Sequence, residues 1–173
     1  MWTVEKINEL IKDVPDFPKP GIVFKDITPV LENHEAFVSV ARQFVNSLPE
    51  GVEKIVAMES RGFIFGAAVC QHIDAGLVLV RKPGKLPREV INHSYQLEYG
   101  TDTLEIHKDA IKPGEKVVIL DDVLATGGTA AATKKLVEDL GGEIIGYEFL
   151  MEIEFLKGRE KLPGVPVKAL IQI

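Results

Sequence analysis

The sequence is poor in cysteine and in long apolar stretches. Its single cysteine, Cys70, excludes an internal disulfide and a zinc site built on several cysteines. The apolar neighbours of Cys70 predict a thiol in the core. No apolar run approaches the ~20 residues that a membrane-spanning helix needs, and the first residues do not have the pattern of a signal peptide. We therefore expect a cytoplasmic protein that makes no membrane contact.

Positively charged residues are outnumbered by negatively charged ones. The sequence has 20 Lys and Arg residues and 26 Asp and Glu residues, for a net charge of −6. This balance argues against general nucleic-acid binding. The four histidines lie in no cluster with metal-ligand spacing and are predicted to be structural or solvated: His34, His72, His93 and His107. With 46% hydrophobic and 27% charged residues and no visible linker, residues 1–173 are predicted to form one domain.

Predicted strands and helices alternate along the chain without a repeat, which favours an α/β fold with a parallel sheet. Helices are expected at about 3–13, 35–48, 62–73 and 129–140. Strands are expected near 54–58, 77–81, 90–97, 102–106, 116–120, 143–151 and 166–171. Three prolines and a glycine exclude a helix or a central strand at 15–21, and Gly141-Gly142 should end the last helix.

The most informative segment is VVILDDVLATGGT, residues 117–129. Its apolar start predicts a buried parallel strand, so the residues that follow lie where open α/β sheets bind ligands. Glycine N–H groups, threonine hydroxyls and a helix N-terminus would together bind a phosphate. These residues, the anion loop, are Ala125, Thr126, Gly127, Gly128 and Thr129. An ordinary glycine-rich turn is the alternative.

Asp121 and Asp122 precede the anion loop and would repel a bare phosphate. Carboxylates accept hydrogen bonds from vicinal hydroxyls, so this pair favours a phosphorylated ribose as the ligand. A Walker loop needs a lysine after its second glycine, and a dinucleotide fingerprint needs GxGxxG; neither occurs. The segment resembles the motif with which type I phosphoribosyltransferases bind 5-phospho-α-D-ribose 1-diphosphate (PRPP). That resemblance implies a twisted parallel sheet flanked by helices, with an N-terminal hood at about residues 1–33.

A second anion-binding loop is predicted at ESRGF, after the strand at 54–58. Ser60 and Arg61 can donate to a diphosphate there, whereas a surface salt bridge is the simpler interpretation of Arg61 alone. The segment is similar to the diphosphate loop of adenine-specific members of the family. By this resemblance we assign Arg61 both to PRPP binding and to catalysis.

Residues 81–88, the basic loop, carry four cations interrupted by proline and glycine. Such a run is usually a solvated surface, but a hinged basic loop can also close over a polyanion. The sequence RKPGKLP is similar to a loop of the adenine-specific members. The resemblance implies a lid in which Arg81, Lys82 and Lys85 contact PRPP.

Two other segments resemble the same members. In YQLEYG, an exposed Glu-Tyr pair alone would be structural, but the resemblance implies that Glu98 lies near N7 of the base and Tyr99 near the diphosphate. In FPKPGIVFKDI, which alone could be a packed loop, backbone groups of Val23 would bind the base edge and Phe24 would stack on its ring. Some members have Arg at the position of Lys25, so its base contact is the least supported.

The C-terminal segment LMEIEFLKGREKL is also similar to the family, which places Ile153 on the other face of the base. The implied reaction converts adenine and PRPP to AMP and diphosphate in a homodimer. Mg²⁺ would be held mainly by substrate and water, without a metal site built from protein groups alone. A different purine base and a PRPP-sensing regulator are the alternatives, although a regulator would usually need a DNA-binding extension.

Overall fold

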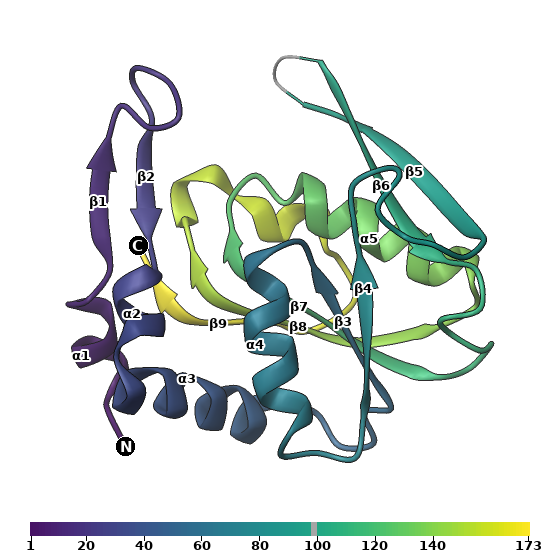
Figure 1. Cartoon of the computed structure of the whole chain (residues 1–173), viewed down its shortest axis with the longest axis horizontal. Helices are drawn as coiled ribbons and strands as arrows, with labels where there is room; N and C mark the ends of the chain where they lie inside the picture. Colours follow the sequence, from purple (N-terminus) through teal and green to yellow (C-terminus); the bar gives the residue numbers. More distant parts are fainter. Residues whose placement is uncertain (98–99) are drawn as a thin grey trace.

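The computed structural model describes residues 1–97 and 100–173 (Figure 1). One five-stranded sheet has the order β4-β3-β7-β8-β9, and all its neighbouring strands are parallel. Its strands are β3 (Lys54–Met58), β4 (Gly76–Val80), β7 (Lys116–Leu124), β8 (Glu143–Glu152) and β9 (Val167–Gln172). The predicted fold class, a parallel sheet flanked by helices, is confirmed, and β7 is its central strand.

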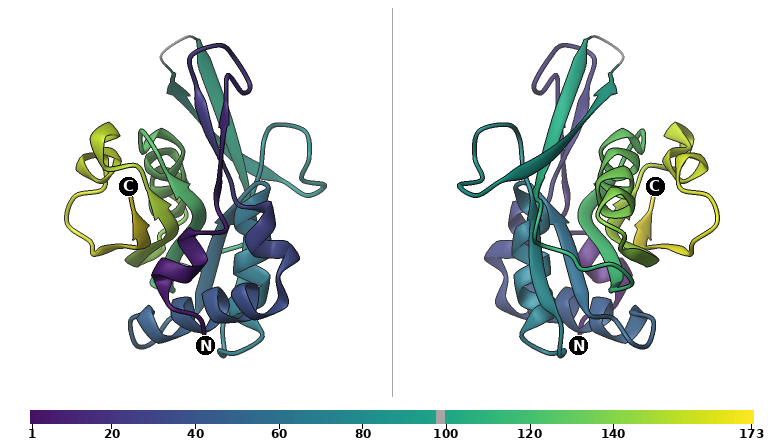
Figure 2. Two further views of the ribbon diagram at one scale, coloured as in Figure 1. Left: turned by 90° about the vertical axis from the view of Figure 1, so that its left-hand side faces the viewer. Right: turned by 90° about the vertical axis from the view of Figure 1, so that its right-hand side faces the viewer.

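Helices cover both faces of this sheet, as the side views show (Figure 2). On one face, α3 (His34–Ser47) and α4 (Arg61–Cys70) share a core cluster with Val118, while α5 (Gly128–Asp139) shares a cluster with Ile119 on the other. Both strand residues are fully buried. A strand that is covered on both faces needs a continuous apolar run rather than alternation, which explains the pattern that predicted β7.

The other four strands form two antiparallel hairpins outside the parallel sheet. The first joins β1 (Lys12–Pro15) to β2 (Val23–Asp26), and the second joins β5 (Val90–Gln96) to β6 (Thr101–His107). The two hairpins rise on opposite sides of the molecule, with the loop between β7 and α5 between them (Figure 1). They therefore flank the part of the sheet where the sequence predicted ligand binding.

The N-terminal prediction was partly wrong. The helix expected at 3–13 is only α1 (Val4–Asn8), because the backbone of Lys12–Pro15 pairs with β2 instead. The helix α2 (Thr28–Glu32) was not predicted. Pro29 occupies its first turn, and Asp26 Oδ1 accepts the N–H of Thr28 at 2.9 Å. Both errors arise because elements of four or five residues are too short to show a helical or strand-like hydrophobic pattern in the sequence.

The central strand is longer than predicted. β7 continues past Leu120 to Leu124 because β8 continues beside it, with Asp121 paired with Phe149. The two carboxylates thus lie in the last part of the strand and not in the following loop. After β8 come two short 3₁₀ helices, η1 (Glu154–Leu156) and η2 (Gly158–Lys161). Gly141 ends α5 as predicted, with φ +84°.

Among residues 1–97 and 100–173, no helix combines the length and the apolar character that crossing a bilayer requires.

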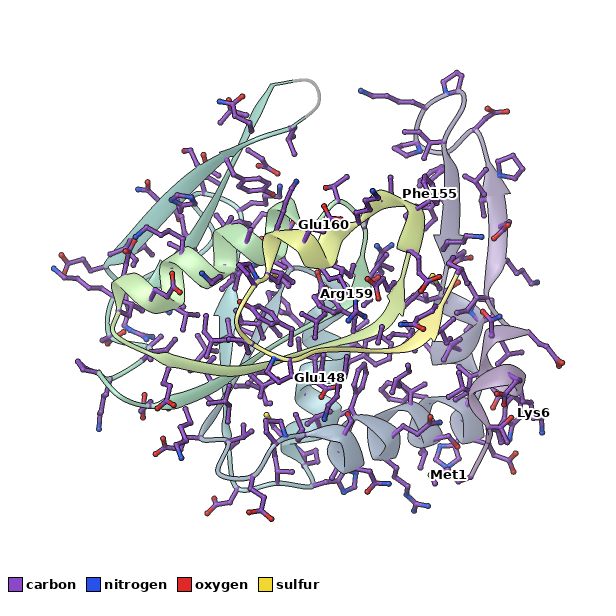
Figure 3. All side chains as sticks on the ribbon, turned by 180° about the vertical axis from the view of Figure 1, so that it is seen from behind. Met1, Lys6, Glu148, Phe155, Arg159 and Glu160 are labelled. Carbon is purple, nitrogen blue, oxygen red and sulfur yellow. The ribbon has the colours of Figure 1, made fainter. Side chains whose placement is uncertain are left out.

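Glu148 is a buried carboxyl group in β8 with 1% of its surface exposed (Figure 3). Ser47 Oγ lies 2.8 Å from Glu148 Oε2 and 2.9 Å from the carbonyl oxygen of Phe44. The single Ser47 proton can serve only one of these acceptors, so a protonated Glu148 that donates to Ser47 satisfies all three groups. Burial raises the pKa of Glu148 to about 7, against the opposing effects of Ser47 and Lys168.

Glu148 should therefore make stability depend on pH. Its folded pKa lies above the ordinary value of 4.5, so the stability that its proton provides is complete below pH 4.5 and is lost as pH rises through about 7. The loss at pH 8 amounts to up to about 3 kcal/mol. We expect Glu148→Gln to melt close to wild type at pH 5 and clearly above it at pH 8.

Thermal melts between pH 4.5 and 8.5 check this expectation. Glu143→Gln is the matched control, since Glu143 lies on the same strand but is exposed. Melting curves of wild type and Glu148→Gln that shift in parallel with pH would show that Glu148 is ionised in the folded protein.

Candidate active site

The loop between β7 and α5 forms a pocket whose lining includes the whole anion loop. Asp121, Val123, Leu124, Ala130 and Phe149 complete that lining. Gly127 has φ +79°, a left-handed conformation that glycine adopts without strain. In the described part of the chain, no side chain caps α5, so its first N–H groups stay available to an anion. A loop of this geometry can bind a phosphate, and phosphate binding by these residues stays a prediction.

The segment η2 packs directly against the anion loop. A Cβ atom on Gly127 would lie 2.3 Å from the carbonyl oxygen of Gly158, and one on Gly158 would lie 2.3 Å from that of Ala125. Arg159 holds η2 in place, because its Nε donates to Glu152 Oε1 at 2.7 Å (Figure 3). The shape of the anion loop thus depends on a backbone contact between segments about thirty residues apart.

The two adjacent aspartates have different surroundings. Asp121 lines the pocket and accepts the N–H of Asp122 at 2.9 Å. Asp122 is 5% exposed, and Arg61 Nε lies 2.5 Å from its Oδ2, although the N–H is not aligned for a hydrogen bond. Burial and then the charge of Asp122 raise the pKa of Asp121 well above its ordinary value, while Arg61 lowers it. The two aspartates therefore act as one negatively charged site, and the Arg61 guanidinium neutralises part of that charge.

The predicted diphosphate loop begins α4 immediately after β3, where Ser60 precedes Arg61. The Arg61 guanidinium also lies over the ring of Phe24, at 4.9 Å from its centroid. A cation–π contact of this kind links the N-terminal hairpin to the sheet. The structure thus brings together a proposed base-binding residue, a proposed diphosphate-binding residue and, through Asp122, a proposed ribose-binding residue.

The remaining proposed base-binding residues are placed as follows. Val23 is half exposed on β2, and Lys25 Nζ contacts Asp13 Oδ1 at 2.6 Å across the hairpin. Ile153 follows β8, and its N–H donates to the carbonyl oxygen of Leu124 at 3.0 Å, which places it beside the end of β7. Lys25 already has a partner on its own hairpin. Glu98 and Tyr99 lie outside the described residues.

Carboxylates of the protein pair with the cations of the basic loop. Lys85 Nζ donates to Glu59 Oε1 at 2.6 Å, and Arg81 Nε lies 3.4 Å from Glu59 Oε2. Lys82 pairs with Asp102 and donates its backbone N–H to Glu59 at 2.6 Å. Burial would raise the pKa of Glu59, but the bonds from Lys85 and Lys82 outweigh it and hold that pKa below its ordinary value. The loop is thus held by internal counter-ions.

Sequence reasoning missed four residues of this region: Glu59, Tyr95, Asp102 and Gly158. Strand alternation over residues 90–96 placed Tyr95 on the inner face of the hairpin, which was a usable signal. Local sequence carries no sign of the other contacts. A second hollow beside the anion loop is lined by Tyr95, Lys19 at the tip of the first hairpin and Lys161 in η2. These two lysines add positive charge close to the proposed phosphate site.

Among residues 1–97 and 100–173, no three His, Cys, Asp or Glu side chains lie close enough together to hold a metal ion.

Comparisons with known proteins fit this geometry. The model of the phosphoribosyl transferase domain family matches residues 30–160, which is most of the chain. The chain therefore belongs to the phosphoribosyl transferase domain family, and the resemblance predicted from its motifs is confirmed. Within this family, the chain is similar to adenine phosphoribosyltransferases.

Three relatives are representative. The adenine phosphoribosyltransferase of Geobacter metallireducens is 54% identical over 97% of this chain and 99% of that protein. The crystal structure of the Thermoanaerobacter pseudethanolicus enzyme has a TM-score of 0.96 and 51% identity, covering 99% of this chain and 100% of that one. The Saccharomyces cerevisiae enzyme, complexed with an imino-altritol bisphosphate and adenine, has a TM-score of 0.87 and 39% identity, covering 96% and 97%.

The contact between the anion loop and η2 predicts a specific loss in Gly127→Ala. The new methyl group would collide with Gly158, so the anion loop must move, and we expect ribose 5-phosphate to bind at least about 10-fold more weakly. Isothermal calorimetry measures this change.

Gly164→Ala is the matched control, because Gly164 has φ +83° and open space around its Cβ position. It carries the same backbone strain of about 1 kcal/mol without the collision. Equal affinities in the two variants would contradict the importance of the contact with η2.

Proposed function

We propose that this protein transfers the 5-phosphoribosyl group of PRPP to adenine, giving AMP and diphosphate, and so acts in purine salvage. The observation that carries the proposal is the placement of Asp121, the anion loop and Arg61 at one edge of the parallel sheet. Membership of the phosphoribosyl transferase domain family and the adenine bound to the yeast relative support the reaction and the base.

The chemistry is substitution at the anomeric carbon of the ribose. The bond to diphosphate weakens while positive charge develops on the sugar, so the site must hold an oxocarbenium-like ring between a leaving anion and a nucleophilic nitrogen. In this proposal, Asp121 and Asp122 bind the ribose hydroxyls. The anion loop of Ala125, Thr126, Gly127, Gly128 and Thr129 binds the 5′-phosphate.

The diphosphate would bind across the two other loops. Ser60 and Arg61 lie at the start of α4, and Tyr99 is added from the sequence resemblance. Arg81, Lys82 and Lys85 would neutralise the leaving group when the basic loop closes. To do so, the two lysines must exchange Asp102 and Glu59 for phosphate oxygens, which carry more charge than a carboxylate.

Adenine would lie between the N-terminal hairpin and the end of β8. Phe24 would stack on one face, Ile153 would cover the other, and backbone groups of Val23 would bind the edge of the base. Glu98 would exchange the proton at N7 as N9 attacks. For Lys25, the ion pair with Asp13 supports a role in the hairpin more than contact with the base.

Mg²⁺ is part of this proposal because PRPP carries the oxygen ligands that the ion prefers. Asp121 offers an additional carboxylate at the pocket, and no three-residue metal cluster lies within the described ranges. Bound Mg²⁺ would neutralise negative charge on the diphosphate. The family suggests this cofactor, and the site chemistry fits an ion held mainly by substrate and water.

We treat residues 1–173 as one domain and residues 1–33 as a hood over the base, supported by the position of the first hairpin (Figure 1). A homodimer and a cytoplasmic location remain predictions from the sequence.

A spectrophotometric assay with adenine, PRPP and Mg²⁺ tests the function directly. We expect AMP formation, and we expect hypoxanthine, guanine and xanthine to compete poorly with adenine. Equal use of another purine would reassign the base, and binding of PRPP without turnover would favour a PRPP-sensing regulator.

Asp122→Asn tests the ribose site. The substitution preserves shape but removes a charged acceptor, so we expect kcat/KM to fall roughly 10- to 100-fold. Arg61 is partly exposed and can be rehydrated, so the melting temperature should change little. A variant with near-normal kcat/KM would remove Asp122 from the ribose site.

Glu98 provides the test on the base side. Glu98→Leu should lower kcat by about 10²- to 10⁴-fold with little loss of PRPP affinity, because the lost proton exchange matters only in the transition state. Glu98→Gln should lie between Leu and wild type, since an amide still bonds N7 but exchanges no proton. Steady-state kinetics with PRPP calorimetry separate these cases, and small, equal losses would make Glu98 structural.

A further inference from the structure

Tyr95 connects the second hairpin to the anion loop. Its hydroxyl lies 3.2 Å from Thr129 Oγ1, and its ring atoms lie 3.4 Å from the position that a Cβ on Gly128 would occupy. Gly128 thus leaves room for the ring, and the hydroxyl reaches the side chain beside it. In the proposed reaction, Tyr95 makes no contact with the substrates.

The same hydroxyl also reaches the basic loop through Asp102. Tyr95 and Asp102 face each other across β5 and β6, and the Tyr95 hydroxyl lies 3.3 Å from Asp102 Oδ2. That oxygen also accepts from Lys82 Nζ. Asp102 Oδ1 accepts the backbone N–H of Thr103 at 2.9 Å, which fixes the carboxylate. One oxygen atom is therefore shared by Tyr95 and by a cation of the basic loop.

A tyrosine hydroxyl has one proton, so Tyr95 donates either to Asp102 or to Thr129. When the anion loop is empty, Thr129 can donate to Tyr95, and Tyr95 donates to Asp102. A phosphate on the anion loop accepts the Thr129 proton instead and leaves Thr129 as an acceptor for Tyr95. Asp102 then loses one donor and binds Lys82 more strongly.

We propose that Tyr95 is a positioning residue whose hydroxyl couples the anion loop to the basic loop, so that phosphate on the first holds Lys82 on Asp102. This inference rests on the proposed function only for the identity of the two anions, a 5′-phosphate and a diphosphate. It predicts negative coupling between them. PRPP and AMP both place a 5′-phosphate on the anion loop. Lys82 therefore leaves Asp102 at a cost when PRPP binds, and the same cost favours the departure of diphosphate while AMP is still bound.

The test measures that coupling with ribose 5-phosphate and with inorganic diphosphate in the presence of Mg²⁺. Calorimetry gives the Kd of diphosphate with and without saturating ribose 5-phosphate, and the ratio of the two values is the coupling. We expect the wild-type ratio to be roughly 3- to 10-fold larger than the ratio in Tyr95→Phe, the range for one hydrogen bond. Reversing the titration should give the same ratio.

Ser94→Ala is the matched control, since Ser94 lies next to Tyr95 and its hydroxyl bonds Thr103 on the exposed face, at 2.8 Å. It should keep the wild-type ratio. Asp102→Asn is a second variant, which should also lower the ratio and keeps the test open if Tyr95→Phe is unstable. A purely structural role would weaken both affinities in Tyr95→Phe and leave the ratio unchanged.

The outcomes separate this inference from the function. An unchanged ratio in Tyr95→Phe and Asp102→Asn, or no coupling in wild type, would overturn the inference while AMP formation from adenine still supports the function. A wild-type protein that binds neither anion would overturn both.

Discussion

The burial of β7 on both faces is the constraint on which the rest of the structure depends. A parallel strand in the middle of a sheet needs cover from helices on each side, and its connections must return over those faces. All five parallel strands consequently end at one edge of the sheet. That arrangement places the loops after β3 and β7 side by side, so Arg61 reaches Asp122 although they are far apart in the sequence. The candidate site follows from strand direction.

Charge balance is the second feature that shapes this site. Three carboxylates, Glu59, Asp102 and Asp122, occupy cations that the proposed reaction would direct at a diphosphate. These internal counter-ions keep an acidic protein from leaving a cluster of cations unpaired. A carboxylate carries one negative charge and a diphosphate carries several. A diphosphate can therefore displace these carboxylates from their cations, whereas an anion of lower charge would not. Selectivity for a polyanion can thus be present before the ligand arrives.

Much of the fold and part of the site could be predicted from the sequence. The strand at 143–151 and the helices at 35–48 and 129–140 are long and strongly patterned, and the short strand at 54–58 is mostly apolar; the structure contains all four. The N-terminal hairpin could not be identified, because Lys12–Pro15 becomes a strand only through its pairing with β2. The continuation of β7 past Leu120 likewise depends on β8, which pairs with it to Leu124.

The sequence by itself determined the contiguous features of this protein: the residues of the anion loop, the two aspartates, the loop ESRGF after β3, and the family. Each of these features depends on residues within its own short segment, where the spacing along the chain fixes the local chemistry. Only the tertiary structure decided which partners lie beside them. Gly158 against the anion loop, Phe24 over Arg61, and Tyr95 between Thr129 and Asp102 are contacts between distant segments. Such contacts arise from how strands and helices pack, and local sequence does not encode that packing.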